Sequence, residues 1–292
     1  MPTKRSEFDQ TIRAQFLGVR MRKLRDDRGL TLKYVASYLG VEFSTLARYE
    51  RAEWPFRRDH VAGLLDMYAV YDEREREELV ALAANAGRAN HWYRNGVEPE
   101  TKQGPMPDRW WIHDRAEEIC VYNPTVLPEW VQTAAYLDEV LARVRPHKPL
   151  SPNEGNKRAH DIALRAKALT SSGDVRLHMV VDERVLRRPI AGRAALKAQL
   201  EHLVTLVRNH PNIDIRIVPE QTSAHPGLLG GFTLYRMPQP YPEVVFVDHI
   251  GGALLIEAGA EEYSKAFNAL ATEVADGDTE SIALINEIRE EL

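Results

Sequence analysis

Hydrophobic positions between residues 10 and 87 recur at the spacing of short amphipathic helices. Leu17, Met21 and Leu24 form an i, i+4, i+7 stripe, and Gly29 ends the helix that this stripe predicts. Four helical segments follow, and the residues that begin or break them are Thr31, Gly40, Asp59 and Asp72. Because helices this short must share one core, the pattern predicts an all-α five-helix domain over residues 10–87.

The periodic pattern stops between residues 88 and 108. Pro99, Gly104 and Pro105 interrupt this stretch, which reads as a linker. Trp92 and Tyr93 indicate that part of the linker packs against another surface.

Residues 109–292 alternate between two periods and predict a second domain. Helical patterns cover residues 126–144, 153–170, 191–209, 261–274 and 279–291. Strand-like runs cover residues 175–181, 213–218, 232–235, 244–247 and 253–256. Proline and glycine turns separate the strands after Ile213, which favours antiparallel hairpins over a doubly wound sheet. We expect an α+β domain with an antiparallel or mixed sheet.

The composition excludes several classes of protein. The 292 residues are 44% hydrophobic and 28% charged, which is typical of globular proteins. The single cysteine, Cys120, excludes an internal disulfide and a multi-thiolate metal site. No apolar run reaches the roughly 18–20 residues of a membrane span, and the first ten residues carry no secretory signal. We expect a cytoplasmic protein that binds no membrane, no metal and no cofactor.

The net charge of −5 hides an uneven distribution along the chain. Residues 1–58 contain 13 lysines and arginines against 7 aspartates and glutamates, whereas the remaining residues contain 25 against 36. A basic head on an acidic body points to an anionic partner for the head alone.

The twenty residues from Leu32 to Arg51 meet the constraints of a helix-turn-helix. The fifth position must be small so that the helix backbones can approach, and it is Ala36. The ninth lies in the turn, where a left-handed conformation favours glycine, and it is Gly40. The five core positions hold Val35, Leu39, Val41, Leu46 and Tyr49. All seven constraints are met in register.

The outward face of the second helix in this motif carries side chains that suit duplex DNA. Phe43 and Ala47 lie on this face, and Ser44 and Thr45 can bond base edges or phosphates. Arg48 can make the bidentate contact to guanine O6 and N7. Basic residues at nearby helix starts suit phosphates. The residues that we expect to bind DNA are Lys33, Phe43, Ser44, Thr45, Arg48, Arg51, Arg57 and Arg58.

Two other interpretations of this region stay open. The five helices could form a hairpin module that binds no nucleic acid. Each arginine could also be an ordinary solvated surface charge.

The second domain offers a second set of candidates, for a partner or ligand. Arginines cluster just past a strand end, and His225 lies in a loop before another strand. A salt-bridge network, a rigid turn and an ordinary aromatic core would explain the same residues. The candidates are Trp130, Arg184, Arg187, Arg188 and His225. Metal-site spacing is absent, and we expect no catalytic residues and no enzyme activity.

Residues 17–70 resemble the Xre (Cro/CI-type) repressor family. The resemblance rests on the order of five helices and on the stretch from Gly40 to Glu50. Where many relatives carry a DNA-contacting glutamine, this chain has Leu32. Where relatives have a small cap and a basic residue at the start of the recognition helix, it has Glu42 and Phe43.

Residues 110–292 resemble the uncharacterised C-terminal domain that many actinobacterial regulators attach to this head. The matching segments lie at 128–133, 181–189, 199–200, 211–219, 224–232 and 247–248. Glu129 and Trp130 replace a usual Gly-Leu pair, and Asp248 replaces a commoner glutamate.

The two resemblances imply a transcription factor whose second domain senses a partner or ligand. We expect it to bind specific DNA sequences as a homodimer, because a single short recognition helix reads too few bases for high affinity. Such proteins are described as antitoxin-like, which implies a C-terminal domain that senses a small protein encoded nearby. Sensing of a small molecule is the alternative, and a DNA-tethered enzyme is a third, more remote one. A protein partner requires an exposed apolar patch, whereas a small ligand requires a closed, polar-lined cavity.

Overall fold

The computed structural model divides into two compact units. It describes residues 11–86, 109–144, 160, 162–164, 166–167, 169–171, 174–239, 241–249 and 252–292. One unit comprises Met1–Ile112, Pro238–Val244 and Ile256–Gly259, and the rest of the chain forms the other. The predicted linker, residues 88–108, lies outside the described residues.

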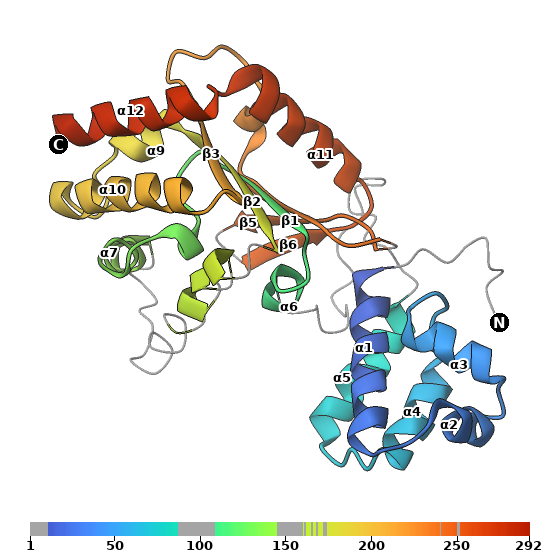
Figure 1. The fold of residues 1–292 in the computed structure, drawn as a ribbon. Coiled ribbons are helices and arrows are strands. Elements are labelled where there is room, and N and C mark those ends of the chain that lie inside the picture. Colours follow the sequence, from blue (N-terminus) through green and yellow to red (C-terminus); the bar gives the residue numbers. More distant parts are fainter. Residues whose placement is uncertain are drawn as a thin grey trace. The chain divides into compact units, whose positions relative to one another are not determined.

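Five helices make up the described N-terminal region, as the hydrophobic pattern predicts (Figure 1). Thr11 and Thr31 cap the first two helices through their side chains, and Asp72 caps the fifth. The predicted cap at Asp59 is wrong, because the N-cap of the fourth helix is Arg57, two residues earlier, and the helix begins at Arg58. The helices are α1 Ile12–Asp27, α2 Leu32–Leu39, α3 Phe43–Glu50, α4 Arg58–Met67 and α5 Glu73–Asn85.

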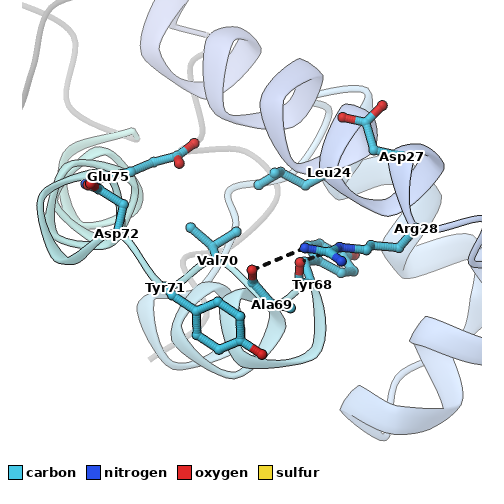
Figure 2. Close-up of a pocket in the computed structure, with 9 residues that line it drawn as sticks. All are labelled: Leu24, Asp27, Arg28, Tyr68, Ala69, Val70, Tyr71, Asp72 and Glu75. Carbon is cyan, nitrogen blue, oxygen red and sulfur yellow. Dashed lines mark hydrogen bonds between the residues drawn. The ribbon is translucent and has the colours of Figure 1, made fainter.

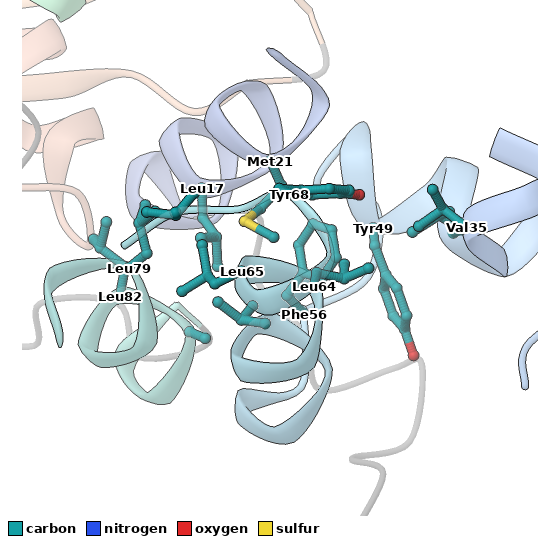
Figure 3. Packing of buried hydrophobic residues seen from close by; sticks show 14 of the residues in the cluster. Leu17, Met21, Val35, Tyr49, Phe56, Leu64, Leu65, Tyr68, Leu79 and Leu82 are labelled. Atoms are coloured by element: carbon teal, nitrogen blue, oxygen red, sulfur yellow. The ribbon is translucent and has the colours of Figure 1, made fainter. Parts of the chain in front are cut away.

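The five helices bury one shared hydrophobic cluster (Figure 3). Among the predicted core positions, Val35 and Leu46 are fully buried and Tyr49 is 8% exposed. Leu39 and Val41 are partly buried and pack against the same cluster. The remaining buried members are Leu17, Met21, Ala36, Phe56, Val61, Leu64, Leu65, Tyr68, Val70, Leu79, Leu82 and Ala83.

Two glycines set the close geometry of the helix-turn-helix. Gly40 has φ +65° at the C-cap of α2, the left-handed conformation that the turn requires. Gly18 brings α1 against the end of α3, because a Cβ there would lie 2.7 Å from the carbonyl oxygen of Glu50.

The second unit contains most of a six-stranded mixed sheet, and the expected α+β architecture is confirmed. The strands are β1 Glu118–Asn123, β2 Arg176–Asp182, β3 Ile213–Val218, β4 Phe232–Arg236, β5 Val244–His249 and β6 Gly252–Ile256. The helices of this unit are α7 Ala134–Val144, α9 Glu183–Arg187, α10 Arg193–Asn209, α11 Ala260–Ala269 and α12 Asp278–Glu291, and α6 Arg109–His113 belongs to the first unit except for its last residue. Short turns η1 Glu129–Val131, η2 Pro226–Leu229 and η3 Leu270–Val274 join them.

The strand order is β3-β2-β1-β4-β5-β6. β1, β2 and β3 are parallel, with Ile119 opposite Leu177 and Leu177 opposite Ile213, and β4 runs antiparallel to β1. The preference for antiparallel hairpins after Ile213 is therefore wrong for β3. α10 precedes β3 and carries the chain back across the sheet, which allows a parallel strand.

The elements that the sequence analysis missed include β1, α6 and α9. β1 shows no alternation, because its four central residues are all buried between covering layers. α9 is a short helix in a segment expected to be a loop, and Asp182 caps it by accepting from the backbone N–H of Arg184 (3.1 Å). The helix expected over 126–144 begins only at Ala134. The helix expected over 153–170 lies partly outside the described residues, although those residues between 160 and 171 that the structure describes are helical.

We expect Gly18→Ala and Gly63→Ala to change the stability of the N-terminal helices in opposite directions. A methyl group at Gly18 would press on backbone, which costs about 1–3 kcal/mol. Gly63 lies in α4 with nothing within 4 Å of an added Cβ, so alanine should stabilise α4 by about 0.5–1 kcal/mol. Amide hydrogen exchange of peptides from residues 12–85 in the full chain measures both changes. Equal effects at the two sites would contradict the close approach of α1 and α3.

Candidate nucleic-acid interface

The helix α3 is held in place by its buried face. Leu46 packs in the cluster, and the Tyr49 ring lies 5.1 Å from the ring of Phe56. Trp54 packs against Tyr49 from the segment that follows α3, with a ring separation of 6.5 Å. The inner face of α3 is therefore fixed by the shared core and by two aromatic side chains that follow the helix in sequence.

A buried ion pair joins α3 to α1. Arg25 Nε donates to Glu50 Oε1 (2.6 Å) and Nη2 donates to Oε2 (2.9 Å), so the contact is bidentate. Both side chains are under a tenth exposed. Arg25 Nη1 also donates to the carbonyl of Leu30 (2.9 Å), which anchors the loop before α2. The hydrogen bonds to Glu50 raise the pKa of Arg25 above its ordinary value.

The outward face of α3 is open to water. Phe43 is 54% exposed, Ser44 is exposed, and Thr45 is partly buried. Ala47 was expected to face outward, but it is 8% exposed and belongs to the buried side. The exposed side chains Phe43 and Ser44 lie at the N-terminal end of the helix, where a recognition helix contacts base edges.

Arg48 does not extend freely from this face. Its guanidinium carbon lies 4.7 Å from the centre of the Trp54 ring, a cation–π contact. Glu53 Oε2 is 3.9 Å from Arg48 Nε, and Glu53 Oε1 accepts from Arg51 Nε (2.7 Å). Sequence reasoning did not include Glu53 and Trp54 in the site. An acid and an aromatic residue just after the helix were the available signal.

Three basic residues lie at the starts of α2 and α4, a position that favours the binding of anions such as phosphate. Lys33 is exposed in the first turn of α2, and Arg58 is the exposed first residue of α4. Arg57, the N-cap of α4, pairs with Asp59 (Nη2 to Oδ2, 2.6 Å). The hydrogen bond from Arg57 lowers the pKa of Asp59. Backbone N–H groups at a helix start add to the attraction for anions.

A hollow of about 330 Å³ in the N-terminal region is lined by α1 and the α4–α5 connection (Figure 2). Arg28 crosses it and donates to the carbonyls of Tyr68 (2.7 Å) and Ala69 (3.1 Å) at the end of α4. The hollow therefore holds a structural contact that closes a helix terminus. The lining residues are Leu24, Asp27, Arg28, Tyr68, Ala69, Val70, Tyr71, Asp72 and Glu75.

Two of the three arginines predicted to bind a partner in the second unit, Arg184 and Arg187, form salt bridges. Arg187 donates to Glu183 of its own helix (2.6 Å) and to Glu291 of α12 (2.7 Å). Arg184 pairs with Glu220 (3.3 Å), and Arg188 is the exposed C-cap of α9. These contacts match the structural alternative considered for the cluster.

Trp130 and His225 have separate surroundings. Trp130 is 6% exposed in η1, and its ring lies 5.3 Å from that of His113. His225 stands edge-on to Tyr122 (6.3 Å), and its buried Nδ1 makes no hydrogen bond. Burial, with a smaller contribution from the Asp182 carboxylate, raises the pKa of Tyr122 to about 12, so this phenol stays protonated at neutral pH.

Comparison with known families assigns the two parts of the chain separately. A family model described as a domain of unknown function (DUF5753) matches residues 110–287, more than half of the chain. The chain belongs to this family. A model described as a helix-turn-helix domain matches residues 17–79, which include α2, α3 and α4. No curated protein and no solved structure significantly matches the chain.

The helix-turn-helix match and the geometry of α2 and α3 agree, and a helix-turn-helix domain indicates a DNA-binding regulator. In the DUF5753 domain, Cys120 is buried in β1. Among the described residues, no three or more His, Cys, Asp or Glu side chains gather as a metal site. No helix in the described part of the chain is both long and apolar enough to span a bilayer.

Breaking the buried ion pair between Arg25 and Glu50 should destabilise the packing of α1 against α3. Glu50→Ala leaves the buried Arg25 guanidinium with only the half-exposed carboxylate of Asp26 (2.6 Å), which should cost up to about 3–5 kcal/mol. Replacing both partners, Arg25→Met with Glu50→Leu, should cost much less, because no buried charge remains. Hydrogen exchange of amides in α1 and α3 measures each loss. A double variant as unstable as Glu50→Ala would show that the uncompensated charge is not the cause.

Proposed function

We propose that the chain is a sequence-specific DNA-binding transcriptional regulator of the Xre (Cro/CI) type, in which α3 enters the major groove. The observation that carries the proposal is the division of α3 into two faces. Leu46 and Tyr49 are buried in the helical core, whereas Phe43, Ser44 and Arg48 remain at the surface. This arrangement supports base reading over a hairpin that serves only to pack.

The roles of the polar side chains follow from their positions. Arg48 is restrained by Trp54 and Glu53, which lowers the entropy that its side chain loses on binding a guanine. Lys33, Arg57 and Arg58 supply contacts to phosphates, and these contacts position the helix without reading sequence. A regulator that binds chromosomal DNA works in the same compartment as the chromosome, and the proposal therefore includes a cytoplasmic location.

Dimer formation is part of the proposal. An eight-residue recognition helix reaches only a few base pairs, and proteins of this kind gain affinity by pairing across two half-sites. Two copies related by a two-fold axis would read an inverted repeat.

The DUF5753 domain is proposed to sense a small protein partner rather than to catalyse a reaction. Leu228 and Leu229 in η2 are 69% and 95% exposed. Exposed apolar side chains of this kind support the binding of a protein partner. Two of the three candidate arginines, Arg184 and Arg187, are occupied by carboxylates, which favours a protein contact over capture of an anionic metabolite. A small ligand in the same domain is the second candidate, and it is supported by the buried Nδ1 of His225 that makes no hydrogen bond.

Selection of duplexes from a random pool by the full chain tests DNA recognition. We expect enriched inverted repeats with half-site centres about 10 bp apart, or a multiple of that spacing. Arg48→Ala should weaken binding to the enriched site by about 10- to 100-fold, with little loss on mixed-sequence DNA. Arg74→Ala is the matched control, because Arg74 is an exposed arginine of α5 paired with Glu78. An equal loss on both kinds of DNA would reduce Arg48 to a phosphate contact.

Co-purification from the native host tests the sensing role. We expect mass spectrometry to identify a small protein that copurifies with the full chain. The partner should be lost from a variant with Leu228→Ser and Leu229→Ser, because the exposed apolar surface is removed. Leu164→Ser is the control, since Leu164 is also exposed (45%) but lies outside η2. A retained metabolite without a protein would support the small-ligand alternative instead.

A further inference from the structure

The first residue of α3 is a large apolar side chain in contact with water. Phe43 is 54% exposed, although a phenyl ring gains free energy when it is buried. Its exposed neighbour Glu42 is the N-cap of α3 and makes no side-chain capping bond. The N-terminal end of α3 therefore presents an aromatic ring beside a carboxylate.

Phe43 is not a peripheral member of the helical core. Val41, two residues earlier, and Leu39, at the end of α2, both pack against the core cluster, and Phe43 does not belong to it. On α3 the buried side is marked by Leu46 and Tyr49. The ring has therefore not been placed at this position by packing within the domain.

The side chains of Glu42 and Phe43 do not suit a phosphate contact. A phenyl ring has no hydrogen-bond donor for a phosphate oxygen, and the carboxylate of Glu42 repels phosphate. In the major groove, the 5-methyl group of thymine is the apolar feature that a base pair presents, and phenylalanine is one of the side chains that contact it.

We propose that Phe43 is a specificity-determining residue that selects thymine by covering its 5-methyl group. The inference rests on the proposed function, because it requires the N-terminal end of α3 to lie in the major groove. Burying one methyl group corresponds to a roughly fourfold gain in affinity. In a dimer the same contact occurs once in each half-site.

The experiment removes the methyl group and leaves the rest of the base pair unchanged. The duplex used is the sequence that the full chain enriches most strongly from a random pool. Each thymine is replaced in turn by deoxyuridine, and binding of the full chain is measured for every duplex. Wild-type protein should bind about fourfold more weakly when one particular thymine of a half-site loses its methyl group. Phe43→Ala should bind the thymine and deoxyuridine duplexes equally.

A second pair of duplexes separates the methyl group from the thymine carbonyl. Changing the sensitive thymine to cytosine should weaken binding by the wild type, and 5-methylcytosine at that position should recover part of the loss. Phe43→Ala should show no recovery. Phe43→Leu keeps an apolar side chain and should keep the response to the methyl group. It serves as a second variant in case Phe43→Ala is poorly folded.

Tyr34→Ala is the matched control. Tyr34 is an aromatic residue of α2 with similar exposure, 60%, and its removal should leave the response to the methyl group unchanged. An enriched site at which no thymine responds to deoxyuridine, or at which Phe43→Ala responds as strongly as the wild type, overturns the inference alone. The absence of any enriched sequence overturns the proposed function, and this inference with it.

Discussion

The bidentate pair between Arg25 and Glu50 is the constraint on which the position of α3 depends. It joins the end of α3 to α1 inside the helical core, and Arg25 also holds the loop before α2 through Leu30. One buried guanidinium thus sets the position of both helices of the motif. A buried ion pair adds little to stability compared with apolar packing, but it tolerates few alternative geometries. Its main effect here is to define the orientation of α3.

The N-terminal fold could be predicted from sequence because its constraints are local. The identities of Ala36 and Gly40 follow from close helix approach and a left-handed turn, and both are as expected. The order of the sheet could not be predicted in this way. β1 is buried on both faces and shows no alternation, and the parallel pairing of β3 with β2 depends on where α10 returns the chain.

The candidate site was predicted at the level of residues but not of contacts. The exposure of Phe43 and Ser44 follows from helical periodicity, whereas the burial of Ala47 depends on how closely α3 is packed. The restraint of Arg48 by Trp54 is a tertiary contact that spacing alone does not specify. In the DUF5753 domain, α9 turned an expected loop into a helix, and Arg187 consequently points toward Glu291 of α12.

Carboxylates lie beside several of the arginines that we propose bind DNA, and under that proposal they affect how the protein would search a chromosome. Glu53 partly neutralises Arg48 and Arg51, and Asp59 neutralises Arg57. Under the proposed function, such a surface would release fewer counterions when it approaches DNA of random sequence. The protein would therefore stay bound to such DNA for a shorter time. Under the proposed function, such a surface would favour repeated dissociation and rebinding over prolonged sliding along the duplex. At the target sequence, contacts to the bases would then have to supply the affinity that the partly neutralised arginines do not supply through phosphates.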